Sequence, residues 1–350
     1  MERLGPLKSW LSEKTLVKRT TEFIPHMEGS WSKGEEELTA YASGENLYRD
    51  PRDATVLDSP PYRVNVSRSL GSGCSRELAT LSIYQNRPLT EWLPHYSKSA
   101  AYRYWSERLD SLPPTRPDNP NVDRLLCAKA EVLASCLFLG WQEEAHRLTK
   151  ELYNLYKKKL LSDVTGEFSR PLYHWLLRIC FDHFGYEFSG WGQNRRDSVA
   201  DPYAEGECLG EPVLNELFDH WRDADLTPMK NHLVWLCDYY THRTRPAIGV
   251  EFSNDLLHTR FPATILAWFR LREQLGLTNP EIDHPLMQAP YARLISAQPV
   301  YTDELLEAVL ARLRREEVPT LGDMPEDIPD QTSQLQSAGF LSRLFGKRGA

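Results

Sequence analysis

At several places the sequence brings an aspartate next to a histidine or one helical turn from it, among them Asp182-His183, Asp219-His220, Asp238 with His242, and Asp283-His284. Carboxylate oxygens and imidazole nitrogens are ligands that Zn²⁺ and Mn²⁺ accept in hydrolases. On a helix, Asp238 and His242 would share one face, whereas adjacent residues point about 100° apart. A metal site also needs further side chains that hold its ligands in place. We therefore predict no metal and no cofactor. The alternative is a metal-dependent hydrolase that uses His183, Asp238, His242 and His284.

No familiar catalytic motif accompanies these histidines. Gly29 and Gly34 have the spacing of a phosphate-binding loop, but Glu35 stands where that loop requires lysine. The sequence contains no G-x-S-x-G, G-x-G-x-x-G or H-E-x-x-H pattern. These absences lower the expectation of enzymatic activity, and we predict no catalytic residue.

The most unusual feature is a run of acidic residues between positions 197 and 225, which holds nine acids and a single base, Arg222. Such a face can simply be solvated, or it can steer and dock a basic partner, for example a nuclease whose groove attracts phosphate. The aromatic residues nearby could supply the buried anchors that dominate interface energetics, and they are Trp191, Tyr203, Phe218 and Trp221. The predicted partner-binding residues are Asp197, Asp201, Glu205, Glu207, Glu211, Glu216, Asp219, Trp221, Asp223 and Asp225.

The overall charge argues against direct binding of nucleic acid. The chain has 350 residues, with 41 lysines and arginines against 49 acids, so its formal charge is −8. A general nucleic-acid binder would need a basic face. Aromatic and basic residues do alternate between Tyr102 and Arg108, but on a helix they would lie all round it, which favours packing over base stacking.

The apolar patterning argues against a membrane protein. No run approaches the ~18 consecutive apolar residues of a membrane span. Met1–Phe23 lacks the uninterrupted apolar core of a signal peptide. The six cysteines are scattered and form no C-x-x-C pair, which is typical of reduced core residues. We expect a cytoplasmic protein with no membrane partner.

Helices are expected to position the residues named above. From about Arg76 onward, apolar residues recur at helical spacing between clear stop signals. Gly140, Gly185 and Gly276 each follow such a stretch and predict helix ends. The expected helices, of which the first two should form a hairpin, are Val122–Leu139, Trp141–Leu161, Ser169–Phe184, Pro212–Arg222, Thr227–His242, Phe261–Leu275 and Thr302–Glu317.

The fold class that follows is mainly α: packed helical hairpins in one extended or two-lobed body, with a less regular N-terminal segment. Glycines and the Pro60-Pro61 pair indicate turns before residue 75, beside one helix. We predict an irregular segment 1–75, an N-terminal helical domain 76–190, a C-terminal helical domain 191–318, and a polar linker with a short basic amphipathic tail, 319–350. Within that tail, Gly339–Lys347 could dock on a partner or a membrane surface, but self-docking or disorder is favoured.

The C-terminal half resembles a known family. The run Phe261–Leu277 (FPATILAWFRLREQLGL), followed by Asp283-His284-Pro285-Leu286, is similar to the C-terminal domain of the PoNe-immunity (PoNi-like) family, whose members protect bacteria from PoNe-type and related polymorphic nuclease toxins. Trp221–Asp225 fits the same pattern, and Tyr96–Lys98 and Leu125–Leu161 are similar to the family's helical N-terminal part. The resemblance covers about residues 80–317, and the chain departs from the pattern before residue 76 and in its C-terminal tail.

The resemblance implies a non-enzymatic inhibitor, made in the cytosol, that neutralises a cognate toxin of a type VI or related secretion system. The toxin is expected to be a nuclease, and inhibition would block its active site or substrate groove. The family offers no shared catalytic residues, so the interface prediction rests on the acidic residues. A homodimer is a further possibility. A helical adaptor of a secretion assembly is another alternative, and it would bind a partner without protecting any cell.

Overall fold

The computed structural model describes residues 3–45, 47, 62–112, 124–157, 161–162, 170–187, 212–246, 250–253 and 255–326. Helices dominate these residues, which confirms the predicted mainly α class. In chain order the helices are α1 Glu13–Ala42, α2 Arg63–Gly71, α3 Ser75–Tyr84, α4 Leu89–Ser111, α5 Leu126–Leu139, α6 Gln142–Lys157, α7 Pro171–Phe184, α8 Pro212–Asp219, the 3₁₀ turn η2 Thr227–Met229, α9 Lys230–His242, α10 Ala263–Gln274, α11 Pro285–Gln288 and α12 Glu304–Glu316. Two short strands, β1 Arg124–Leu125 and β2 Leu161–Ser162, pair in parallel.

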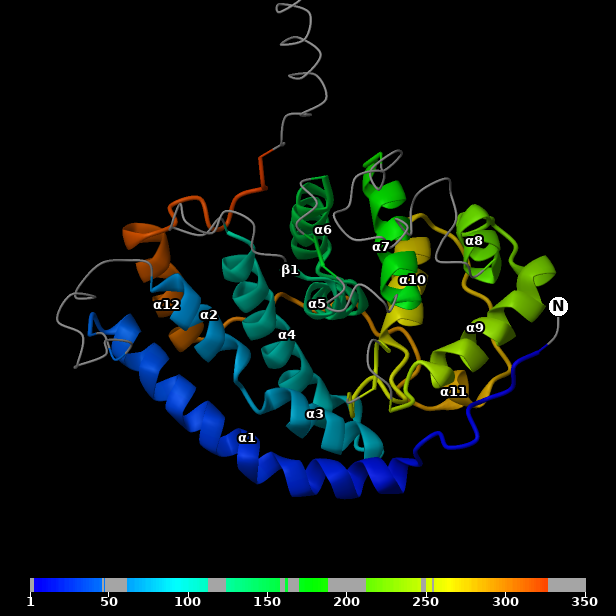
Figure 1. The fold of residues 1–350 in the computed structure, drawn as a ribbon, viewed down its shortest axis with the longest axis horizontal. Helices are drawn as coiled ribbons and strands as arrows, with labels where there is room; N and C mark the ends of the chain where they lie inside the picture. Colours follow the sequence, from blue (N-terminus) through cyan, green and yellow to red (C-terminus); the bar gives the residue numbers. More distant parts are fainter. Residues whose placement is uncertain are drawn as a thin grey trace, which may run out of the picture.

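The helices pack side by side around one continuous core. Figure 1 shows α1 along one edge of the body, with α2, α3 and α4 above it and α7, α8, α9 and α10 at the opposite end. The helices α5 and α6 lie between these groups. Buried apolar side chains form one cluster that extends along the chain from Leu16 to Leu321.

The helices predicted beyond Val122 are confirmed, with ends that differ by a few residues. Gly140 ends α5 with a left-handed φ of +79°. The N–H groups of Gly140 and Trp141 donate to the carbonyls of Leu137 and Cys136, each at 2.9 Å, which is the usual bonding at a glycine-ended helix. Since α6 begins directly afterwards and packs on α5, the predicted hairpin is also confirmed.

The first 75 residues contain more helix than predicted. The 30-residue helix α1 runs through Gly29 and Gly34, so the prediction of turns at these glycines is wrong. Gly34 serves close packing instead, because a Cβ atom there would lie 2.5 Å from the Oγ of Ser72. The helix begins at a well-formed cap, since the Oγ of Ser12 accepts the N–H of Thr15 at 3.2 Å. A short helix, α2, follows later in the same segment.

Residues before and at the end of α1 contact parts of the chain that come much later. The Nε of Arg3 lies 3.0 Å from Oδ2 of Asp238 on α9, which is 235 positions away. The indole N–H of Trp10 donates to the carbonyl oxygen of Thr259 at 2.7 Å. At the other end, Arg312 on α12 donates to the carbonyl oxygen of Tyr41 at 2.5 Å. The N-terminal residues and α1 together therefore contact two elements that come much later in the chain, α9 and α12.

Residues 319–326, predicted to begin a polar linker, pack on the body instead. Leu321 is buried, and the buried guanidinium of Arg108 on α4 donates to the carbonyl oxygens of Leu321 and Asp323, each at 3.2 Å. The linker prediction is wrong for this stretch because its backbone carbonyls, rather than its acidic side chains, make the contacts. The tail Gly339–Lys347 and Cys208 lie outside the described residues, and the other five cysteines are free. Within the described part of the chain, no helix is long and apolar enough to cross a membrane.

Candidate functional site

The acidic residues predicted to bind a partner fall into two groups. Those outside the described residues are Asp197, Asp201, Glu205, Glu207 and Glu211. The others lie on α8 and on the turn that follows it. Glu216, Asp219, Asp223 and Asp225 are exposed there, and we call these four residues the acidic surface.

The acidic surface keeps a net negative charge. Asp223 Oδ2 lies 2.7 Å from Nδ1 of His220, and Glu216 contacts His232 on α9. Asp225 Oδ1 accepts the N–H of Thr227 at 2.8 Å, and hydrogen bonds from Thr227 hold the pKa of Asp225 below its usual value. Arg222, the arginine of this segment, lies 3.0 Å from Asp182 on α7, which is not one of the four residues of the acidic surface.

Trp221 is not an exposed anchor. The side chain is 2% exposed, and its indole N–H donates to Oδ2 of Asp182 at 2.8 Å. Its prediction as a partner-binding residue is wrong, because a side chain without accessible surface has none to bury on a partner. Phe218 is half-buried, and the guanidinium of Arg178 lies 3.8 Å from its ring centre. Trp191 and Tyr203 lie outside the described residues.

The backbone beneath the acidic surface is fixed by Arg272. This completely buried side chain of α10 donates to the carbonyl oxygens of Trp221 at 2.6 Å, Asp223 at 3.0 Å and Thr278 at 2.8 Å. Five N–H donors in one plane allow a guanidinium to bridge several carbonyls at once. Two stretches that carry the family resemblance, Trp221–Asp225 and Phe261–Leu277, are thereby in direct contact. Asp223 and Asp225 of the acidic surface therefore lie on a turn that the core holds in place.

The four residues of the alternative hydrolase do not form one site. Oδ1 of Asp238 lies 3.0 Å from Nε2 of His284, and both side chains are completely buried. The Nε2 of His242 contacts the carbonyl oxygen of Gly5 at 3.0 Å instead. His183, on α7, packs against the rings of Phe184 and Trp221. The helical spacing of Asp238 and His242 therefore pointed to the wrong histidine.

The Asp238–His284 pair holds three segments together. Nδ1 of His284 accepts the N–H of Leu286 at 3.0 Å at the start of α11, so we assign the proton to Nε2, which faces Asp238. This arrangement requires a neutral imidazole, and burial lowers the pKa of His284. Oδ2 of Asp238 accepts from Arg3 at 3.0 Å and from the N–H of Gly5 at 2.9 Å. The pair thus joins α9, α11 and the N-terminal residues.

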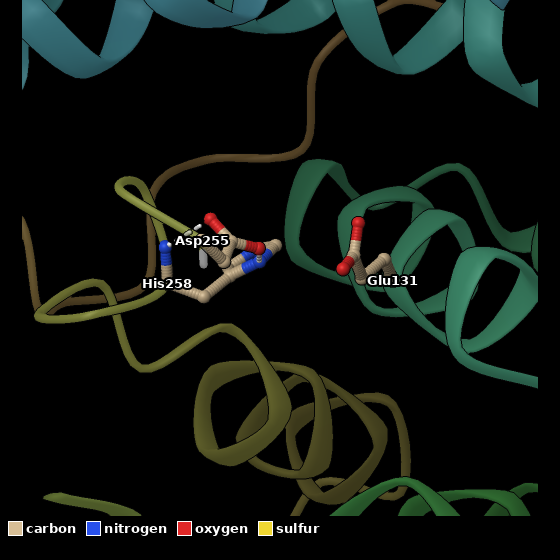
Figure 2. Close-up of side chains that lie close together, drawn as sticks. All are labelled: Glu131, Asp255 and His258. Atoms are coloured by element: carbon tan, nitrogen blue, oxygen red, sulfur yellow. Dashed lines mark hydrogen bonds and ion pairs between the residues drawn. The ribbon is translucent and has the colours of Figure 1, made fainter. Parts of the chain in front are cut away.

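A different group of potential ligands escaped sequence reasoning: Glu131, Asp255 and His258 (Figure 2). Among the described residues, this is the group of three whose potential ligand atoms all lie within 4.8 Å of one another. Figure 2 shows Glu131 on α5, across from the other two, which lie in the segment between α9 and α10. In the sequence, the one feature that could have indicated this group is the short spacing of Asp255 and His258. Nothing local connects that pair to Glu131.

The side chain of Arg76, from α3, takes the place of a cation among these three residues. Its Nη2 contacts Oδ2 of Asp255 and lies 3.5 Å from Oε2 of Glu131 and 3.4 Å from Nδ1 of His258. Arg103 on α4 donates to the same Glu131 oxygen at 2.6 Å. The positive charge that a metal ion would supply is therefore already present in guanidinium groups, which stay protonated.

Charge and space both indicate a structural role for this centre. Burial raises the pKa of Asp255, but Arg76 and His258 outweigh it and hold that pKa well below its usual value. Nδ1 of His258 lies 2.6 Å from Asp255, and proton-transfer dyads of enzymes share this arrangement, so the space beside His258 decides whether a substrate could reach it. The adjoining cavity has a volume of about 10 Å³, which is room for one water molecule. A substrate could not enter beside His258 in this structure.

The chain matches no protein-family model, no curated protein and no solved structure. The resemblance of Phe261–Leu277 to the PoNe-immunity family therefore stays a prediction from the residues themselves. In the described part of the chain, the acidic surface is the feature that bears on the predicted partner.

Proposed function

We propose that this protein binds a basic partner protein through the acidic surface, and that the partner is a cognate secreted toxin which it neutralises. The observation that carries the proposal is the exposure of four carboxylates between positions 216 and 225, two on α8 and two on the following turn, which Arg272 fixes to the core. Complementary charge accelerates the encounter of two proteins. A turn that is already ordered loses less conformational entropy on binding.

A nuclease is the kind of toxin that this surface suits. The substrate groove of a nuclease attracts phosphate groups and is therefore lined by basic residues. Carboxylates placed in that groove would occupy the positions of the phosphates and exclude the nucleic acid. The resemblance of Phe261–Leu277 and Trp221–Asp225 to the PoNe-immunity family points to the same class of toxin. An inhibitor of this kind would act in the cytosol of the cell that makes the toxin.

The test begins with the tagged protein, purified from its native cells through a wash at moderate salt. A partner that co-elutes in stoichiometric amount is identified by mass spectrometry and then expressed in a second host, with and without this protein. The proposal expects the partner alone to stop growth and co-expression to restore it. Binding without rescue would favour the adaptor alternative. A stoichiometric Zn, Mn or Fe ion together with hydrolase activity would favour the enzyme.

Charge reversal then tests the acidic surface itself. The variant combines Asp219→Lys and Asp223→Lys with Asp225→Asn, because asparagine can keep the bond to the N–H of Thr227. We expect association with the toxin to slow by about tenfold and to depend less on salt, and dissociation to become faster, because carboxylates that occupy the groove are buried in the complex. The matched control changes three exposed acids of α1: Glu28→Lys, Glu35→Lys and Glu36→Gln. Association kinetics equal to those of the control would remove these residues from the interface.

A further inference from the structure

A cleft lies between the turn that joins α3 to α4 and the segment Pro290–Ile295. Its volume is about 370 Å³, which falls within the range of roughly 300–1,000 Å³ found for small-molecule sites. It shares no residue with the acidic surface. About half of its wall is apolar, and the apolar lining residues include Ile83, Pro88, Leu89, Trp92, Leu294 and Ile295.

Both walls of the cleft are anchored in the core. Trp92 stacks on Phe138 with ring centres 6.5 Å apart. Tyr291 packs edge-on against Tyr84 at 5.6 Å and donates its hydroxyl to Glu13 at 2.8 Å. A site with anchored walls is formed before a ligand arrives, which lowers the entropic cost of binding.

Two arginines, Arg87 and Arg293, line the cleft and are exposed. The position of Arg87 is set by Asn86, which takes a left-handed φ of +54° and ends α3. The N–H of Asn86 donates to Ile83 at 3.0 Å and the N–H of Arg87 donates to Ser82 at 2.9 Å, so this turn is well fixed. Leu89, which begins α4, lies at the same cleft, and no side chain caps that helix start.

Of the two described acids beside the cleft, Glu91 and Glu13, neither makes a close ion pair with Arg87 or Arg293. Nε of Arg87 is 4.0 Å from Oε2 of Glu91, and both side chains are about half exposed, so this pair is weak. Glu13 is engaged by the hydroxyl of Tyr291 and by the side-chain amide of Asn86 at 3.4 Å. The positive end of the α4 dipole adds to the attraction for an anion.

We propose that this cleft binds a small organic anion with an aromatic or branched apolar body. The carboxylate of the ligand lies between Arg87 and Arg293, where charge-assisted hydrogen bonds can form. Its apolar body packs against Trp92 and Leu294. The wall offers apolar surface and the mouth offers positive charge, and a ligand of this class uses both.

The test compares two probes that differ only in charge, naphthalene-2-carboxylate and naphthalene-2-carboxamide, by calorimetric titration of the full-length protein. We expect the carboxylate to bind about tenfold more tightly than the amide, the effect of one charge-assisted bond. The double variant Arg87→Gln/Arg293→Gln should abolish this preference and leave amide binding unchanged. The control variant Arg19→Gln/Arg68→Gln removes two exposed arginines elsewhere and should bind both probes as the wild type does.

A second variant tests the apolar wall. Leu89→Trp would fill the cleft from the start of α4, so both probes should lose their binding while the circular dichroism spectrum and cooperative unfolding stay unchanged. The proposal is overturned if neither probe saturates the wild-type protein at millimolar concentration, if the two probes bind equally, or if the double arginine variant keeps the preference for the carboxylate.

Discussion

The guanidinium of Arg76 lies among three side chains that would otherwise suit a divalent cation. Glu131, Asp255 and His258 come from two separate parts of the chain, and α3 supplies the arginine that neutralises them. A charge pair removed from water is stable only when both partners are present. Because the cation here is the side chain of Arg76 and not a metal ion, these residues fix the packing of α3 on the segment before α10.

Replacement of Arg76 by methionine should destabilise the protein strongly. The side chain keeps a similar length, but Asp255 loses the arginine that holds its pKa low while it remains buried. Breaking such a pair from one side costs roughly 3–5 kcal/mol. Urea unfolding measures the loss. The matched change at an exposed position, Arg19→Met, should stay within about 0.5 kcal/mol of wild type. If the two variants unfold alike, the buried acids do not depend on Arg76.

His284 should make stability depend on pH. The folded protein keeps this histidine neutral, with a pKa below the value of 6.5 that it has when exposed. Unfolding therefore takes up a proton as the pH falls, so the contribution of His284 is complete above pH 6.5 and decreases as the pH falls toward the folded pKa. The slope can reach about 1.4 kcal/mol per pH unit.

The measurement is the free energy of unfolding of wild type and of His284→Asn on both sides of that pKa. Asparagine is chosen because its side-chain oxygen can accept the N–H of Leu286 and keep the start of α11. The wild type should lose more stability than the variant as the pH is lowered. Parallel curves would show that protonation of His284 does not oppose folding.

Residue types alone could not locate these pairs. Asp238 and His242 share a helical face, so spacing favoured them, yet Asp238 contacts His284, which lies 46 positions away. The burial of Trp221 could not be predicted either. Its neighbours in the sequence are exposed, so it looks like a surface residue, and only the structure shows its contact with Asp182. The charge of the acidic surface, by contrast, follows from composition and was predictable.

Helix ends are the elements that local sequence specifies best. Gly140, Gly185 and Gly276 all adopt left-handed φ values where helix ends were expected. Gly29 and Gly34, by contrast, lie inside α1 and do not end it. A glycine that ends a helix and one that admits a neighbouring side chain look identical in sequence. The full length of α1 was therefore missed, while α5, α6 and α7 were predicted with nearly correct ends.

Two of the glycines that end helices offer a matched comparison. Gly140 and Gly185 have φ values of +79° and +77°, so alanine should be strained at both by about 1–2 kcal/mol. A Cβ atom at Gly140 would also lie 2.6 Å from Cβ of Ala297, whereas at Gly185 no atom of the described residues lies within 4 Å. Gly140→Ala should therefore lower the midpoint of thermal unfolding more than Gly185→Ala. Equal losses would mean that the segment around Ala297 moves aside without cost.

Residues 3–10 contact parts of the chain that lie more than 200 positions away, on α9 and before α10. Deletion of residues 1–11 removes Arg3 and Gly5 from Asp238 and the indole of Trp10 from Thr259. Since buried acceptors are left unpaired, we expect the free energy of unfolding to fall by roughly 2–4 kcal/mol. Hydrogen exchange should then show faster opening of α9. The point variant Lys8→Ala, at an exposed position, serves as the control. Unchanged exchange in α9 would mean that these contacts add nothing to its stability.

The fold class was predictable because helical periodicity is a local property of the sequence. The arrangement of the helices was not, since it depends on contacts such as Arg312 with Tyr41, which lie 271 positions apart. Distant pairs of this kind leave no periodic signal in either segment. The docking of residues 319–326 through their backbone carbonyls was hidden for the same reason.

The contacts of α1 have a consequence for synthesis on the ribosome. This helix emerges long before Asp238, Thr259 and Arg312, which contact the residues preceding α1 and its C-terminal end. Until then Tyr41, whose ring lies 4.1 Å from the guanidinium of Arg312 in the finished protein, lacks part of its cover. The nascent chain therefore carries an incompletely covered end of α1 until α12 has been made, and chaperones that shield apolar surface should associate with it during that interval.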